Sequence, residues 1–126
     1  MYAFQMWGKA SDATVRKGAK YIRKKVKFKY NTQHADLYAH YYYSLAMRHR
    51  GGRDGEFYKK MLGAQLIKNQ SEDGSWLDVG GGRKVRAVGA SYQGTSALSR
   101  HYRSCLCALI LEAPYRYNWY AGAVKR

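Results

Sequence analysis

Apolar positions in the first part of the chain recur at the spacing of a helix. Residues 2–7 form a short apolar piece that Gly8 ends, which leaves little room for a helix of its own. Further on, apolar residues recur at steps of four, three and four positions, at Val15, Ala19, Ile22 and Val26. Most residues between them are cationic. This spacing predicts a helix with one buried face and one basic face. Ser11 is its expected N-cap, with Asp12 in the first turn.

The second block of apolar residues has almost no polar face. Asp36 is the expected N-cap of a helix that runs from Leu37 to about His49, and Gly51 and Gly52 close it. A helix that is apolar on all sides is normally surrounded by other elements. We therefore expect this helix to lie inside the fold.

The third block is amphipathic again. Asp54 is the expected N-cap, and the helix should end near Asn69. Its inward face is predicted to consist of Phe57, Tyr58, Met61, Leu62, Gln65 and Leu66. A loop rich in Gly, Arg and Lys is expected to follow over residues 78–94.

The fourth block, centred on residues 102–112, is apolar on all sides like the second. Ser96 and Ser99 are both candidates for its N-cap, and the sequence does not choose between them. Pro114 is expected to end the helix, because proline disfavours helical geometry at the residue before it.

The order of helix types predicts an all-α repeat architecture. An amphipathic and an apolar helix alternate twice. This order suits an α/α-toroid-like array with an inner row of apolar helices and an outer row of amphipathic, solvent-exposed helices. The chain would then be a single, partial domain over residues 1–126. Its parts would be a first repeat at 11–52, a second repeat at 53–117 and a basic, aromatic tail at 118–126.

The turn between the third and fourth blocks resembles a known motif. Residues 70–76, Gln-Ser-Glu-Asp-Gly-Ser-Trp, are similar to the Gln-Trp repeat of squalene-hopene cyclases and their prenyltransferase relatives. Residues 36–47 resemble an inner helix of that family, in its bacterial branch of toroids that are not established enzymes. Residues 102–117 resemble the closing inner helix and tail. The resemblance implies the C-terminal part of an α/α toroid with one side left open.

The resemblance also implies structural roles within the turn. In the family, the glutamine and tryptophan of the motif tie neighbouring helices together, and here these positions are Gln70 and Trp76. Asp73 is placed to cap or brace the turn, and Gly74 permits a positive φ.

The catalytic motifs of the family are missing from the sequence. The Asp-x-Asp-Asp acid of squalene cyclisation, the Asp-x-Cys-Tyr zinc context of protein prenyltransferases and the Cys-Gly-Glu-Gln thioester of complement-type toroids do not occur. We therefore predict no catalytic residue, no metal site and no cofactor. The interpretation as an enzyme would require a split or degenerate terpenoid cyclase or prenyltransferase with an acid-bearing partner.

Other candidate constellations favour ordinary structural roles. His34, Asp36 and His40 straddle a helix start and place no two ligands at i and i+4, so a metal site is not expected. Residues 80–84, Gly-Gly-Gly-Arg-Lys, lack the spacing of a phosphate-binding loop. No nucleophile elbow supports a hydrolase. A possible aromatic cavity lining, with core packing as the favoured alternative, consists of Tyr38, Tyr41, Tyr42 and Leu45.

The charge balance suggests a second kind of partner. The formal net charge is +15, from 23 Lys and Arg against 8 Asp and Glu. Such a field attracts nucleic acid or an anionic membrane, although a solvated surface is the simpler interpretation. The candidate polyanion-contacting residues all lie on the first long helix: Arg16, Lys17, Lys20, Arg23, Lys24 and Lys25.

Cysteine usage and hydropathy place the chain in the cytoplasm by default. Cys105 and Cys107 point to different sides of a helix, so we expect neither a disulfide nor a chelate, but two buried small side chains. The longest apolar run is too short for a membrane span, and the N-terminus lacks the features of a signal peptide.

The sequence therefore predicts a non-catalytic structural or interaction module. We expect it to complete a larger helical array, or to bind a protein partner or a second copy through its exposed inner helices. A basic module that binds nucleic acid or anionic membrane is the main alternative.

Overall fold

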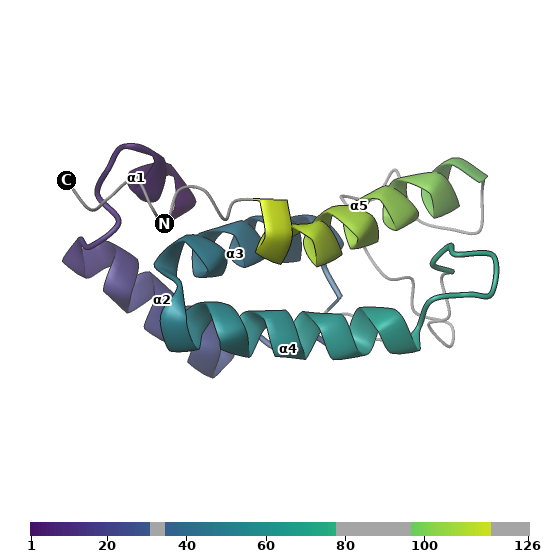
Figure 1. Cartoon of the computed structure of the whole chain (residues 1–126), viewed down its shortest axis with the longest axis horizontal. Helices are drawn as coiled ribbons and strands as arrows, with labels where there is room; N and C mark the ends of the chain where they lie inside the picture. Colours follow the sequence, from purple (N-terminus) through teal and green to yellow (C-terminus); the bar gives the residue numbers. More distant parts are fainter. Residues whose placement is uncertain (31–34, 78–96, 117–126) are drawn as a thin grey trace.

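In the part that the structure describes, the chain folds into helices joined by turns and loops. This computed structural model describes residues 1–30, 35–77 and 97–116, and over these ranges the chain forms five helices and no strand. They are α1 (Tyr2–Met6), α2 (Ala13–Lys25), α3 (Leu37–Arg50), α4 (Gly52–Lys68) and α5 (Ala97–Arg116) (Figure 1). The all-α fold class is confirmed. The predicted loop at 78–94 and the tail at 118–126 lie outside the described residues.

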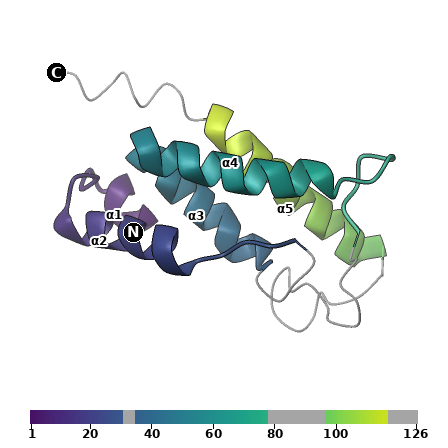
Figure 2. The ribbon, with the colours of Figure 1, turned by 90° about the horizontal axis from the view of Figure 1, so that it is seen from below.

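Helix α3 is the centre of the arrangement, because it packs against each of the other four helices. Figures 1 and 2 show that α3 and α4 are antiparallel and joined by a tight turn, and that α5 returns beside both of them. As a result α3 and α5 run in the same direction. Helices α2 and α4 also share a direction, opposite to that of α3 and α5.

The N-terminal segment forms a short helix of its own, contrary to the expectation from its length. The amide Nε2 of Gln5 donates a hydrogen bond to the carbonyl oxygen of Ala46 in α3, at 3.0 Å. Gly8, at φ 75°, turns the chain immediately afterwards. A tertiary contact 41 residues away in sequence thus anchors a helix too short to be stable alone.

Helix α2 begins at Asp12, so the prediction of Ser11 as N-cap was wrong. The carboxylate Oδ1 of Asp12 accepts the backbone N–H of Thr14 at 2.6 Å. Its carbonyl accepts the N–H of Arg16, which is the first intrahelical bond. Ser11 therefore lies one residue outside the helix. The predicted stripe is buried at Val15, Ala19 and Ile22.

Helix α3 has the predicted ends but not the predicted surroundings. Asp36 accepts the N–H of Ala39 at 2.9 Å, and Gly51 ends the helix at φ 67°. Tyr38 and Tyr42, however, are 45% and 41% exposed. The expectation of a helix covered on all sides was wrong, because α1, α2, α4 and α5 leave one edge of α3 open to solvent.

Helix α4 begins at Gly52, directly after Gly51, so Asp54 is not its N-cap. Asp54 lies in the first turn and pairs with two arginines instead. Its carboxylate oxygens are 3.2 Å from a guanidinium nitrogen of Arg23 and 3.5 Å from Nε of Arg50. These ion pairs join α4 to α2 and to the end of α3.

The inward face of α4 is narrower than the sequence pattern predicted. Tyr58, Leu62 and Leu66 are buried, and Met61 packs against the core from a partly buried position. Phe57 was predicted to face inwards but is 39% exposed, beneath the guanidinium of Arg23 at 5.7 Å from the ring centroid. Its position follows from the approach of α2 on that side.

Helix α5 continues past Pro114 to Arg116, so proline does not end it. Contacts on both sides hold the last turn: Arg116 pairs with Glu112 at 3.3 Å, and the ammonium of Lys59 lies 5.0 Å from the ring centroid of Tyr115. Of the two candidate caps, Ser99 lies within the helix and Ser96 lies outside the described residues.

The two cysteines of α5 have different environments, and neither forms a disulfide. Cys107 is buried, and burial raises the pKa of its thiol to about 12. Cys105 is exposed, so the expectation that both cysteines are buried was wrong for this one. Within the described ranges, no helix combines the length and the apolar character needed to cross a membrane.

Candidate interaction surfaces

The turn after α4 contacts two helices through one tryptophan. The indole Nε1 of Trp76 donates to the carbonyl oxygen of Leu66 at 2.8 Å, and its backbone N–H donates to Oγ of Ser104 at 3.1 Å. The side chain is only 4% exposed and belongs to the main apolar core. The last turn of α4 is thereby connected to the middle of α5.

The tip of this turn is organised by its polar side chains. Nε2 of Gln70 donates to the carbonyl oxygen of Gly74 at 2.9 Å, and Gly74 has φ 80°. Asp73 accepts both the hydroxyl of Ser75 at 2.6 Å and its backbone N–H at 3.0 Å. These bonds all lie within residues 70–75 and close the turn locally.

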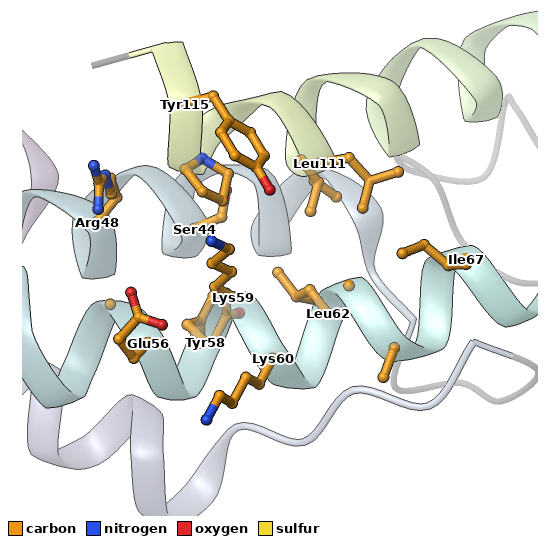
Figure 3. A pocket seen from close by; sticks show the side chains of 15 residues that line it. Ser44, Arg48, Glu56, Tyr58, Lys59, Lys60, Leu62, Ile67, Leu111 and Tyr115 are labelled. Carbon is orange, nitrogen blue, oxygen red and sulfur yellow. The ribbon is translucent and has the colours of Figure 1, made fainter. Parts of the chain in front are cut away.

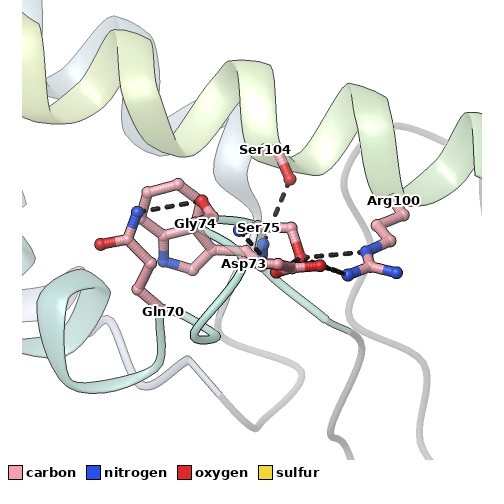
Figure 4. Close-up of polar contacts among 7 residues, drawn as sticks. Gln70, Asp73, Gly74, Ser75, Arg100 and Ser104 are labelled. Carbon is pink, nitrogen blue, oxygen red and sulfur yellow. Dashed lines mark hydrogen bonds and ion pairs between the residues drawn. The ribbon is translucent and has the colours of Figure 1, made fainter.

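One ion pair attaches the tip to α5. Figure 4 shows Asp73, Ser75 and Arg100 pointing towards one another. The guanidinium of Arg100 pairs with the carboxylate of Asp73, and its Nε donates to Oγ of Ser75 at 2.9 Å. The Ser75 hydroxyl and N–H, followed by the Arg100 charge, hold the pKa of Asp73 below its ordinary value of 3.8. All four motif residues therefore have structural contacts.

An apolar groove of about 450 Å³ lies between α4 and α5, above α3. Figure 3 shows Leu111 and Tyr115 of α5 facing Leu62 and Lys59 of α4 across it. The apolar residues that line the groove include Leu62, Ile67, Ile110, Leu111 and Pro114. Sequence periodicity did not reveal the groove, since it depends on how two helices separated by 28 residues approach each other.

Small residues and cations shape the edges of this groove. A Cβ added to Gly63 would meet no atom within 4 Å, so the groove is open above that position. Among the lining residues, Arg48, Lys59 and Lys60 carry positive charge and Glu56 carries negative charge. The groove therefore offers an apolar floor with a net positive rim.

A second, polar groove of about 460 Å³ lies between α2 and α4. Four of the predicted polyanion-contacting residues line it, Arg16, Lys20, Arg23 and Lys24, together with Asp54 and Phe57. The other two, Lys17 and Lys25, are exposed on α2 but do not line the groove. The basic face of α2 is thus partly concave.

Of the tyrosines proposed as a cavity lining, Tyr38 and Tyr42 are exposed, whereas Tyr41 is partly buried and packs against the core. The rings of Tyr38 and Tyr42 are 5.1 Å apart, and those of Tyr41 and Tyr42 are 5.2 Å apart, both edge to face. Leu45 is buried in the core. Neither of the two grooves described above includes these four residues.

A buried polar pair lies under the apolar groove. Nδ1 of His40 and the hydroxyl of Tyr58 share a hydrogen bond of 2.5 Å, and the rings of Phe28 and Tyr43 stand edge-on to the imidazole. Burial raises the pKa of Tyr58 well above its ordinary value, which keeps the hydroxyl neutral. Both side chains are almost completely buried, which suits a role in packing.

The remaining candidates from the sequence do not converge. Asp36 caps α3 and His40 is buried against Tyr58, while His34 and residues 80–84 lie outside the described residues. In the described part of the chain, no three His, Cys, Asp or Glu side chains gather closely enough to hold a metal ion.

Over the described ranges, the structure is an all-α protein in which an apolar groove and a cation-lined groove flank α4. Comparisons with protein-family models, curated proteins and solved structures find no match.

Proposed function

We propose that the chain is a non-catalytic structural or interaction module, and that its α4–α5 groove binds one helix of an acidic protein partner. The observation that carries the proposal is the groove itself, with its apolar floor and its positive rim. An amphipathic helix that lays its apolar side in such a groove is a recurring mode of recognition.

The helix order supports a module of the kind found in α/α toroids. Helices α2 and α4 run one way and α3 and α5 the other, as outer and inner rows of such an array would. The turn at residues 70–76 contacts both α4 and α5, through Trp76 and through the ion pair of Asp73 with Arg100, which supports this proposal. We therefore propose a resemblance to the C-terminal repeats of a squalene-cyclase-like toroid.

The open edge of α3 supports a need for a neighbour. Tyr38 and Tyr42 leave aromatic surface in water where an array of helices would continue. Exposed apolar and aromatic surface of this kind often marks a site of protein association.

Charge decides which occupant the groove favours. A second copy of this chain would bring another +15 charge, and like charges oppose association. A helix with glutamates beside its apolar face would place carboxylates opposite Arg48 and Lys59. The groove can accept at most about the length of α4, which is roughly 25 Å for 17 residues.

A peptide titration tests this proposal. The probe is a synthetic helix of about the length of α4, with leucines on one face and glutamates beside them, labelled for fluorescence anisotropy. We expect it to bind the wild-type protein, and a peptide with lysines in place of the glutamates to bind much more weakly. Equal binding of both peptides, or of neither, would contradict the proposal.

The matched variants are Gly63→Leu and Ala13→Leu. Gly63→Leu fills the open space above the groove. Because leucine is a better helix former than glycine, the fold should be retained. The second places a leucine side chain at an exposed position of α2, away from the groove. Binding should fall for Gly63→Leu alone.

A further inference from the structure

The groove between α2 and α4 is built differently from the α4–α5 groove. No residue lines both, and the α2–α4 groove has four cations against one carboxylate. We propose that this second groove binds the phosphate backbone of a single-stranded nucleic acid. The proposal does not depend on the protein partner proposed above.

The cations form a row along one side of α2. Arg16, Lys20 and Lys24 follow at steps of four residues, so they share one face of the helix. From the first to the last, the row spans about 12 Å, at about 1.5 Å for each residue. At about 3.4 Å for each phosphate of a stacked strand, that length covers three or four phosphates.

One further cation of the groove, Arg23, is held in place before any ligand binds. The guanidinium of Arg23 lies 3.2 Å from the carboxylate of Asp54 and 5.7 Å from the ring centroid of Phe57. Asp54 also contacts Arg50, so its charge is shared between two arginines. Within the described part of the chain, Lys20 and Lys24 have no carboxylate within ion-pair distance and are available to phosphates.

Phe57 is the reason for choosing a single strand. Its ring is 39% exposed in the same groove as the cations, and the guanidinium of Arg23 lies over one face, so that an unpaired base can stack against the rest of this cation–aromatic pair. Cations beside exposed aromatic rings are the usual means by which proteins bind single strands without sequence preference. Tyr21, although 63% exposed, does not line this groove and shares the helix face of Lys17 and Lys25.

The shape of the groove disfavours a membrane as the ligand. A bilayer surface is broad and flat, so it contacts cations that protrude, whereas these four cations line a concave surface. An acidic protein could satisfy the charges but would gain nothing specific from a stacking ring. The overall pI of about 10.0 agrees with a nucleic-acid-binding chain.

Salt dependence provides the quantitative test. The probe is a fluorescent oligothymidylate of about 15 nucleotides, which suits one small binding groove. Four phosphate contacts predict a slope of log affinity against log salt near −3, or a loss of about 50-fold between about 50 and 200 mM salt. A slope close to zero would overturn the proposal.

Two charge-matched double variants locate the site. Lys20→Gln with Lys24→Gln removes two cations from the groove and should reduce the magnitude of the slope by about 1.4. Lys17→Gln with Lys25→Gln removes the same charge from α2 outside the groove and should leave the slope unchanged. Equal losses in the two double variants would mean that only the overall field attracts the strand, and would overturn the proposal.

Phe57→Leu and two other probes separate the classes of ligand. The substitution keeps an apolar side chain but removes the stacking face, so affinity for the oligonucleotide should fall about tenfold with the same salt slope. Vesicles of equal parts phosphatidylserine and phosphatidylcholine, and polyglutamate, should bind more weakly than the oligonucleotide. Tighter binding to either one, or no effect of Phe57→Leu, would overturn the assignment to a single strand.

Discussion

The indole nitrogen of Trp76 donates a hydrogen bond to the carbonyl oxygen of Leu66, ten residues earlier, at 2.8 Å. The chain therefore folds back over the last turn of α4, where the Leu66 carbonyl also accepts the backbone N–H of Asn69 at 3.2 Å. Because the backbone N–H of Trp76 also reaches Ser104, the same residue positions α5.

Trp76→Ala should destabilise the protein by about 3–5 kcal/mol, because it removes a buried aromatic side chain and leaves a cavity. Urea unfolding, followed by circular dichroism, measures the change. Trp7→Ala is the matched control: Trp7 is 83% exposed, so its loss should change the free energy of unfolding by less than about 0.5 kcal/mol. Similar costs for the two substitutions would show that Trp76 is not part of the core.

Two glycines should respond in opposite directions to alanine. Gly63 is helical with open space around a new Cβ, so Gly63→Ala should raise stability by about 0.5–1 kcal/mol. Gly74 has φ 80°, so Gly74→Ala should lower stability by about 1–2 kcal/mol through backbone strain. Thermal unfolding of both variants checks the signs, and a stabilising Gly74→Ala would mean that the turn does not hold this conformation.

Tyr58→Phe should cost about 1–3 kcal/mol, because it removes the hydroxyl that shares a hydrogen bond with buried His40. The loss should appear as a lower midpoint of urea unfolding with an unchanged slope. Tyr115→Phe removes a hydroxyl from an exposed ring and should have almost no effect. If both variants were neutral, the His40–Tyr58 contact would contribute nothing to stability.

Asp73 should contribute to the loss of stability in acid. Its folded-state pKa lies below the ordinary 3.8, chiefly because the Ser75 hydroxyl and N–H donate to the carboxylate, with Arg100 adding to this. The stabilisation is therefore present above pH 3.8 and is lost as the pH falls through the folded-state pKa. Asp73→Asn should lower stability at neutral pH and make stability less dependent on pH in acid. Parallel pH profiles of the variant and the wild type would contradict this.

The local features of the fold were accessible from the sequence. Three- and four-residue periodicity located the long helices, and Asp36 and Gly51 gave the ends of α3 because caps act within a few residues. The errors at Ser11 and Asp54 have different origins. Ser11 stands next to an equally suitable cap. Asp54 forms an ion pair with Arg23 instead of capping the helix. Arg23 lies 31 residues away, so a pattern of neighbouring residues does not reveal this contact.

The candidate surfaces were less accessible, because they depend on distant segments. The motif at residues 70–76 identified Trp76 and Asp73, but Arg100, the ion-pair partner of Asp73, lies 27 residues further along the chain. Charge alone indicated the basic face of α2. That Lys20 lines the groove and Lys17 does not could be seen only from the position of α4. The exposure of Tyr38 likewise follows from where the other helices end, and not from its own helix.

The central claim, that the α4–α5 groove binds an acidic helix, is tested most directly by one ratio. This ratio compares the dissociation constants of the glutamate-bearing peptide for Gly63→Leu and for the wild type, measured by fluorescence anisotropy. We predict a ratio of about ten or more, because the leucine occupies the space that the peptide needs. A ratio of one, with the wild type binding the peptide, would contradict the claim.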